Sequence, residues 1–167
     1  MSVAAVAAAT AAISVVISDS DKKVVSKKLR CYFSHPYEKR HSKKKYRIKK
    51  VLEERGVEVI DPFIGEFKIL RKHNIEEDYY NNPKFKAARE MWIKDLKQVR
   101  ECDMIVAWIP EPSIGCSAEI QYAYKKKKFI QIISPIKHPS FAYVLTGANQ
   151  QFESVKDFEN LRIMRWE

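Results

Sequence analysis

Cysteine is scarce in this 167-residue chain, and its three cysteines do not follow a disulfide or metal-binding pattern. Cys31, Cys102 and Cys116 lie far apart, and each sits in or beside an apolar run. A disulfide framework would need paired cysteines, and a zinc ribbon would need closely spaced ones. We therefore expect neither disulfides nor a bound metal, and a reducing, cytoplasmic location.

The N-terminal segment also lacks the features of a targeting or membrane-spanning sequence. Residues 1–18 are rich in alanine and valine, but they contain no basic residue before their apolar run, and a membrane span needs about 20 strongly apolar residues. Residues 19–28 are strongly polar. We predict a loosely ordered or accessory extension over residues 1–28, with a weak membrane anchor as the less favoured alternative. One domain is expected over residues 29–167.

Positive charge is in excess, with 31 lysine and arginine residues against 21 acidic residues and a formal net charge of +10. Eight of the basic residues lie within residues 39–50. Such a run attracts phosphate or nucleic acid, but a solvated, lysine-rich helix face gives the same pattern. Tyr46 is the only Phe, Tyr or Trp within the run, so the aromatic interleaving that stacks bases is missing. We favour the helix face, and a nucleic-acid partner is not favoured.

From residue 29 onward, short apolar runs alternate with longer segments of helical period, which is typical of βαβ units. Residues 64–83 are too long for an ordinary connection and predict a functional loop or lid with some local helix. The pattern predicts strands over residues 29–34, 57–60, 104–109 and 129–134, helices over residues 41–55, 84–102, 117–127 and 139–146, and a helix or edge strand over residues 155–167. Together these elements indicate a doubly wound α/β domain, flavodoxin-like or Rossmann-like, with a mostly parallel five-stranded sheet and helices on both faces.

The segment after the central strand is the most informative, because ligands of such sheets bind outside the carboxyl ends of the strands. We expect a turn over residues 110–114, after which Gly115 and Ser117 let a ligand approach the amides at a helix start. Glu119 would fall in the first helical turn, where the helix dipole favours its ionised form. Such a carboxylate can attack an anomeric carbon, although a first-turn glutamate without a catalytic role is equally common.

Asp95 is a second candidate because of its place on the predicted helix over residues 84–102. It follows Trp92 by three residues and Met91 by four, which puts it on or at the edge of the apolar face. A carboxylate there must find a partner or line a cavity. The alternative is an aspartate turned clear of the core and bonded to a nearby backbone group. Two carboxylates that converge on one pocket are the minimal equipment for glycosidic-bond chemistry.

Several short motifs occur in a characteristic order along the chain. They are Tyr32-Phe33, Asp95-Leu96, Cys102-Asp103, Pro112-Ser113-Ile114-Gly115 and Ala118-Glu119-Ile120-Gln121-Tyr122-Ala123, spread over residues 29–150. With these motifs in this order, the chain resembles the nucleoside 2-deoxyribosyltransferase superfamily. Its Pro-Ser-x-Gly-x-x-x-Glu turn is most similar to that of the 2′-deoxynucleoside 5′-monophosphate N-glycosidases, whereas many transferases have an aspartate at the position of Ser113.

The resemblance implies roles for individual residues. Glu119 would be the nucleophile, Asp95 would assist at the base or the attacking water, and the hydroxyl of Tyr32 would orient the nucleophile. Ser113 would face a 5′-phosphate. Without the resemblance, Tyr32 is better interpreted as a core aromatic residue, and Ser113 is equally well a turn residue. No cofactor is implied.

The resemblance also implies a homodimer or larger homo-oligomer, in which residues 139–148, with Ser140 near their start, complete the pocket of a neighbouring subunit. Two departures affect the pocket. Similar glycosidases bind phosphate with a glycine-containing loop that carries a serine and an arginine, whereas this chain has Ser34-His35-Pro36-Tyr37-Glu38. Ser34 and His35 are therefore the substrate-binding candidates of this loop. Gln121 stands where a glycine is usual, which predicts a narrower pocket.

The leading hypothesis is an N-glycosidase or N-deoxyribosyltransferase that acts on a small-molecule partner, a (deoxy)nucleoside or nucleoside 5′-monophosphate, with no membrane partner. A glycohydrolase of a larger nucleotide such as NAD is one alternative. A non-catalytic nucleotide-sensing or nucleic-acid-binding module is another, because a fold alone does not establish activity. In an enzyme, the carboxyl groups of Asp95 and Glu119 should open into one pocket, with Tyr32 within hydrogen-bond reach of Glu119.

Overall fold

The computed structural model describes residues 28–75, 85–136 and 147–161, and the structural statements below concern these segments. The predicted extension over residues 1–28 falls almost wholly outside them, as do the predicted helix over residues 139–146 and Ser140. In chain order the elements are β1 (Arg30–Ser34), the short 3₁₀ helix η1 (Tyr37–Lys39), α1 (Lys43–Glu54), β2 (Glu58–Ile60), α2 (Glu66–Lys72), α3 (Phe85–Glu101), β3 (Met104–Trp108), α4 (Ile114–Lys125), β4 (Phe129–Ile133), β5 (Gln150–Phe152) and α6 (Val155–Asn160).

The five strands form one parallel sheet with the order β2-β1-β3-β4-β5. Cys31 pairs with Met104 and Ser34 with Ala107, so β1 and β3 end side by side. The strand order reverses between these two strands, which is where ligands bind in doubly wound sheets. The predicted fold class and the number of strands are confirmed, and the sheet is entirely rather than mostly parallel.

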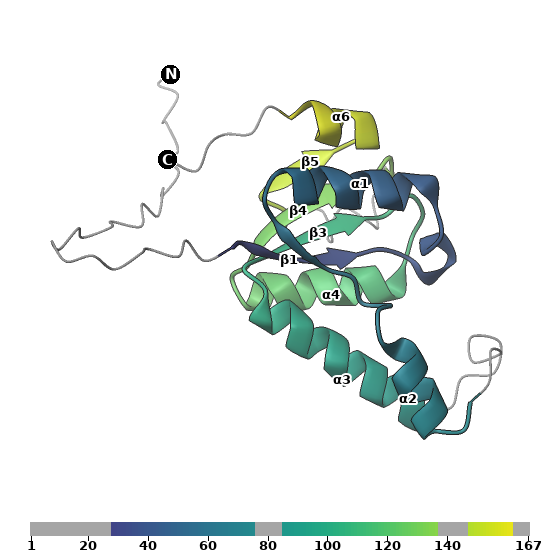
Figure 1. Cartoon of the computed structure of the whole chain (residues 1–167). Coiled ribbons are helices and arrows are strands. Elements are labelled where there is room, and N and C mark those ends of the chain that lie inside the picture. The colour runs from purple at the N-terminus through teal and green to yellow at the C-terminus, as the bar shows by residue number, and fades with distance from the viewer. Residues whose placement is uncertain (1–27, 76–84, 137–146, 162–167) are drawn as a thin grey trace, which may run out of the picture. The chain divides into compact units, whose positions relative to one another are not determined.

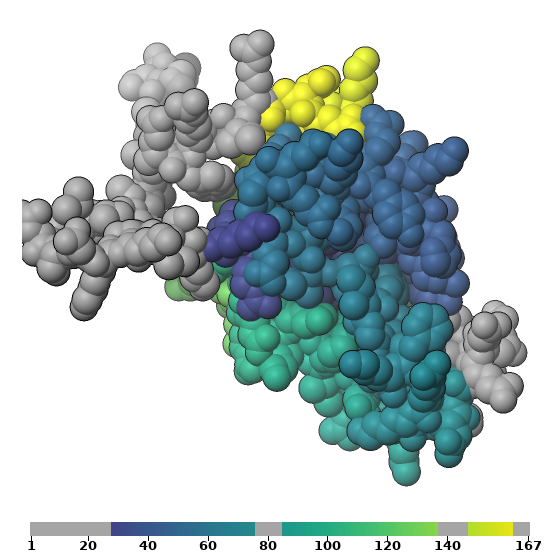
Figure 2. All heavy atoms as spheres, in the orientation of Figure 1, coloured from purple at the N-terminus to yellow at the C-terminus, as the bar shows by residue number. Residues whose placement is uncertain are grey.

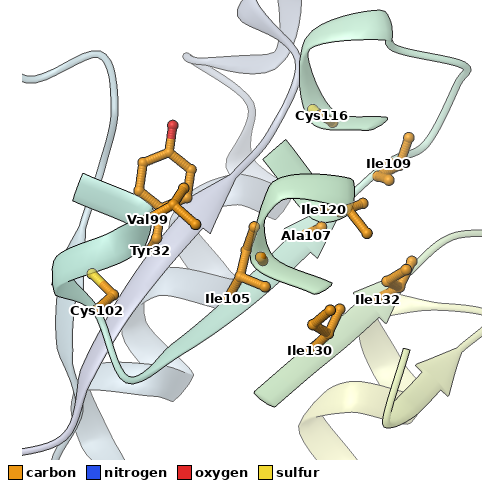
Figure 3. Packing of buried hydrophobic residues seen from close by; sticks show 11 residues of the cluster. Tyr32, Val99, Cys102, Ile105, Ala107, Ile109, Cys116, Ile120, Ile130 and Ile132 are labelled. Carbon is orange, nitrogen blue, oxygen red and sulfur yellow. The ribbon is translucent and has the colours of Figure 1, made fainter. Parts of the chain in front are cut away.

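Helices cover both faces of the sheet, with α1 and α6 on one side and α3 and α4 on the other (Figure 1). Ile48 and Leu52 of α1 and Phe158 of α6 pack on the first face. Val99 of α3 and Ile120 of α4 pack on the second face, against the isoleucines of β3 and β4 (Figure 3). Burial of these apolar side chains on both faces is the main stabilising contribution to the fold.

The central strand and the first helix have the structure that their sequences predict. Every residue of β3 is buried, as expected for an apolar strand covered on both faces. Helix α1 begins after Ser42, whose hydroxyl accepts a hydrogen bond from the amide of Lys44. Ile48 and Leu52 of α1 are buried on one face. Long-range packing and local capping therefore support the same boundaries.

Three sequence-based expectations about the elements need correction. Helix α4 begins at Ile114 rather than at residue 117, because Ser113 acts as its N-cap. The edge strand is β5 at Gln150–Phe152, which the pattern did not predict, whereas the helix alternative for residues 155–167 is confirmed over Val155–Asn160, which form α6. Trp92, expected on the apolar face of α3, is 37% exposed. None of the described helices is long and apolar enough to cross a bilayer.

Candidate active site

A cavity of about 380 Å³ opens at the carboxyl ends of β1 and β3, a volume that suits a small-molecule ligand. Four segments line it. The loop after β1 contributes residues 35–38, and the loop after β2 with the start of α2 contributes Phe63 and Glu66. One face of α3 contributes Asp95, and the second turn of α4 contributes Glu119. The two candidate carboxylates therefore share one cavity, as expected from the sequence.

Glu119 is held by two hydroxyl groups from β1. The Tyr32 hydroxyl donates to Glu119 Oε1 at 2.7 Å, and the Ser34 hydroxyl donates to Glu119 Oε2 at 2.5 Å. In Figure 3 the Tyr32 hydroxyl points away from the core isoleucines. Burial, and next the nearby Glu119 charge, raises the pKa of Tyr32 well above its ordinary value, so the phenol remains a donor. Both Glu119 oxygens are thereby fixed in position.

The environment of Glu119 differs from the sequence-based expectation. Glu119 is the sixth residue of α4 and lies in its second turn, because the helix begins at Ile114. The side chain is buried, and burial raises its pKa to about 7. The hydrogen bonds from Ser34 and Tyr32 lower the pKa, whereas the charge of Asp95 raises it. Desolvation, rather than the helix dipole, therefore dominates its protonation.

Asp95 lies at the edge of the apolar face of α3 and has a side-chain exposure of 14%. Burial raises its pKa to about 6, although Lys94 acts in the opposite direction. Lys94 Nζ lies 3.3 Å from Asp95 Oδ1 and also donates to the Pro62 carbonyl. Asp95 is therefore a partly desolvated carboxyl group that can carry a proton near neutral pH, as a general acid must.

The last residue of β1, Ser34, contacts Glu119, whereas the first residue of the following loop, His35, belongs to the cavity wall. Ser34 is bonded to Glu119. The His35 ring is buried and packs between Phe33 and Phe63, with ring centroids 5.2 and 4.9 Å away. His35 Nε2 lies 3.5 Å from Asp61 Oδ1. Ser34 therefore orients the candidate nucleophile, and His35 shapes the cavity.

Asp61 connects His35 to a lysine that sequence reasoning missed. Lys45 Nζ lies 2.6 Å from Asp61 Oδ2, and both side chains are buried. Burial alone would raise the pKa of Asp61, but hydrogen bonds from His35 and Lys45 outweigh it and hold the pKa well below its usual range. The spacing of Lys45, Ile48 and Leu52 would have identified this lysine, because all three fall on the buried face of α1.

The start of α4 presents Ser113 and Gly115 to the cavity. The Ser113 hydroxyl caps the helix by accepting from the Cys116 amide at 3.4 Å. Ser117 does not line the cavity, and its hydroxyl donates to the Ser113 carbonyl at 2.7 Å. Gln121 is exposed and also lies outside the lining, so the expected narrowing of the pocket is wrong.

The cavity does not offer a thiolate nucleophile. Cys116 lines it, but burial, and next the charge of Glu119, raises the pKa of this thiol to about 12. The group is therefore protonated near neutral pH. Among the described residues, no cluster of three or more His, Cys, Asp or Glu side chains could hold a metal ion. All three cysteines are buried and unpaired.

Most of the basic run of residues 39–50 is neutralised within the molecule. Helix α1 forms part of the face drawn in Figure 2. The ion pairs join Lys39 to Glu111, Lys45 to Asp61, Arg47 to Glu159, Lys49 to Glu53 and Lys50 to Glu54. Such pairing weakens the field available to a polyanion. It supports the interpretation of this run as a helix surface rather than a nucleic-acid interface.

The described geometry combines a doubly wound sheet with two carboxyl groups at its switch point, which is an arrangement suited to glycosidic-bond chemistry. The sequence profile of the nucleoside 2-deoxyribosyltransferase family matches residues 31–161. The chain belongs to this family. Membership supports an enzyme that cleaves or transfers a glycosidic bond.

Solved structures share the fold at low sequence identity. One is the 2-deoxyribosyltransferase from the psychrotolerant bacterium Bacillus psychrosaccharolyticus, with a TM-score of 0.56 and 18% identity over 82% of this chain and 95% of that chain. Another is the CMP N-glycosidase BcmB of Clostridium botulinum, with a TM-score of 0.50 and 18% identity over 78% of this chain and 93% of that chain. No curated protein sequence matches the chain significantly. At this identity the two structures establish a shared fold.

Proposed function

We propose that the chain cleaves or transfers the N-glycosidic bond of a (deoxy)nucleoside or its 5′-monophosphate, with Glu119 as the nucleophile. The observation that carries the proposal is the buried Glu119 carboxyl group, fixed by Tyr32 and Ser34 in a cavity that it shares with Asp95. A nucleophile needs a fixed orientation, and the leaving base needs a proton donor. Family membership and the cavity volume support the same substrate class.

The reaction proceeds in two displacement steps. One Glu119 oxygen forms a bond to C1′ while the C1′–N bond breaks, and the base leaves with that electron pair and takes a proton from Asp95. Water or a second base then attacks C1′ and displaces Glu119. The attacking group transfers a proton back to Asp95, which restores the starting state. The identity of the second nucleophile separates hydrolysis from transfer.

A direct test measures release of free base by the purified full-length chain. The substrates are 2′-deoxynucleosides, ribonucleosides, their 5′-monophosphates and NAD, each with and without a second free base. We expect base release from at least one nucleoside or monophosphate. Glu119→Gln should reduce it by about 10³-fold or more, because the amide cannot form the ester. Glu111→Gln is the matched control, since this glutamate is exposed and does not line the cavity.

The outcomes separate the proposal from its alternatives. If Glu119→Gln releases base at the wild-type rate, Glu119 is not the nucleophile. Exclusive turnover of NAD would favour a glycohydrolase. Four acidic residues of the cavity lining support this alternative, because they would attract a cationic nicotinamide ring. They are Glu38, Glu66, Asp95 and Glu119. Ligand binding without any base release would favour a nucleotide-sensing module. Mass spectrometry of the acid-quenched chain should detect a glycosyl adduct on Glu119.

A further inference from the structure

Glu66 is a buried carboxylate of the cavity that the proposed reaction does not use. It lies in the first turn of α2 and is only 8% exposed. Gly65 precedes it with a φ of 87°, a left-handed conformation that glycine adopts without strain. This turn directs the chain so that Glu66 lines the same cavity as Asp95. The negative charge of Glu66 also contributes to the raised pKa of Asp95, so the two carboxyl groups are close.

The surroundings of Glu66 and Asp95 suit the flat rings of a nucleobase. Met91 and Trp92 lie one helical turn before Asp95 and line the cavity from the same face of α3. Phe63 lines it from the loop after β2. Aromatic side chains stack readily on bases. The base is therefore best accommodated at the α2–α3 end of the cavity, with Glu119 reaching the sugar.

The two carboxyl groups at this end can differ in protonation, because like charges at short distance oppose double ionisation. An ionised Glu66 accepts hydrogen bonds, whereas a protonated Asp95 donates one. A ligand that matches this pair presents an N–H donor beside a ring-nitrogen acceptor. The amino group and N7 of adenine have this arrangement, and so do the amino group and N3 of cytosine. Keto bases such as hypoxanthine and uracil place an oxygen acceptor where the amino group would be.

We propose that Glu66 is a specificity-determining residue that accepts a hydrogen bond from an exocyclic amino group, so that the site selects nucleosides of adenine or cytosine over their keto analogues. The inference rests on the proposed function, because it assumes that the cavity binds a nucleobase. A keto base would place an oxygen acceptor against the Glu66 carboxylate, and repulsion between these two acceptors accounts for rejection of the wrong base. Asp95 protonates the leaving base at the adjacent ring nitrogen.

The test compares substrate pairs that differ only in the amino and keto groups, namely 2′-deoxyadenosine with 2′-deoxyinosine and 2′-deoxycytidine with 2′-deoxyuridine. We expect the wild-type chain to prefer the amino member of at least one pair by about 10-fold or more in kcat/KM. Glu66→Gln should reduce that preference by about 10-fold or more, because an amide can donate to the keto oxygen. Glu111→Gln, a change of the same kind at an exposed glutamate outside the lining, should leave the ratio unchanged.

Binding measurements keep this test independent of turnover. The same nucleosides are titrated calorimetrically into the Glu119→Gln chain and into the Glu119→Gln/Glu66→Gln chain. Tighter binding of the amino nucleosides that depends on Glu66 would support the proposal. Equal affinity or turnover for amino and keto members would overturn it, and a preference that survives Glu66→Gln would do the same. If base release requires Glu119 but is equally fast for the amino and keto substrates, the proposed function stands and the role of Glu66 in specificity is wrong.

Discussion

Lys45 Nζ lies 2.6 Å from Asp61 Oδ2, although the two side chains are only 8% and 4% exposed. A buried ion pair compensates two desolvation penalties, so loss of one member leaves an uncompensated charge in the interior. His35 packs against the same carboxylate. The pair thus links helix α1 to the loop after β2, which forms part of the cavity wall.

We predict that Lys45→Met or Asp61→Asn alone lowers the free energy of unfolding by about 3–5 kcal/mol. The double variant Lys45→Met/Asp61→Leu should recover much of that loss, because it removes both charges. Lys50→Met, which breaks the exposed pair with Glu54, should cost at most about 1 kcal/mol. Urea unfolding at pH 7 measures all four variants, and additive losses in the double variant would contradict the prediction.

The Lys45–Asp61 pair should also make the free energy of unfolding depend on pH in the acid range. The pKa of Asp61 is lowered in the folded state, so its contribution is present above the ordinary value of 3.8 and is lost as the pH falls further. We expect the difference in unfolding free energy between the wild type and Asp61→Asn to shrink between about pH 4 and pH 2. A difference that stays constant over this range would show that Asp61 does not supply it.

Tyr32→Phe and Ser34→Ala should each slow base release at pH 7 by about 10- to 150-fold, the range for a lost hydrogen bond to a charged group. Each hydroxyl lowers the pKa of Glu119, so its removal raises that pKa and shifts the acid limb of kcat/KM to higher pH. Relative to the wild type at the same pH, the loss of activity should therefore become smaller as the pH rises above 7. A loss of equal size at every pH would instead indicate a general structural defect.

The pH dependence of kcat/KM should be a narrow bell with its optimum between about pH 6 and 7. The reaction needs Glu119 ionised and Asp95 protonated, and their pKa values are about 7 and about 6. Asp95→Asn should reduce the rate by about 10²- to 10⁴-fold and abolish the alkaline limb. The remaining acid limb should move to lower pH, because the charge of Asp95 raises the pKa of Glu119. An unchanged bell would exclude Asp95 as the acid.

We predict that Ser113→Ala weakens binding of a nucleoside monophosphate by about 1–3 kcal/mol while barely affecting the free nucleoside. Ser113 and Gly115 line the cavity at the N-terminus of α4, where helix amides favour anions. Ser117→Ala is the matched control, since this serine lies one helical turn further on and outside the lining. Equal losses for both ligands with Ser113→Ala would assign that serine a capping role alone.

The sequence predicted the layers of the fold because each depends on a local pattern. The apolar run of β3 and the buried face of α1 needed no knowledge of distant residues. Strand β5 was not predicted, because Gln150–Phe152 has no hydrophobic alternation. Its position depends on β4, where the Gln131 side chain donates to the Gln150 side-chain carbonyl at 2.5 Å. Such pairing exists only after the sheet has formed.

The candidate site was predictable in part for the same reason. The period of α3 placed Asp95 at the edge of an apolar face. The pairing of Tyr32 and Ser34 with Glu119 spans more than 80 residues and follows from the side-by-side packing of β1, β3 and α4. The raised pKa of Glu119 was not predictable, because burial is a property of the assembled layers. The helix dipole is a local contribution to that pKa, and desolvation outweighs it.

Trp92 gives the cavity an optical signal of its own. Its indole lines the cavity yet remains 37% exposed, so a ligand that enters displaces water from the ring. Trp108, by contrast, is buried in β3 and should report little of this event. Intrinsic fluorescence should therefore change on ligand binding in the wild-type chain and much less in Trp92→Phe. Occupancy of the site can thus be followed in real time with unlabelled ligands, whether or not the bound molecule is turned over.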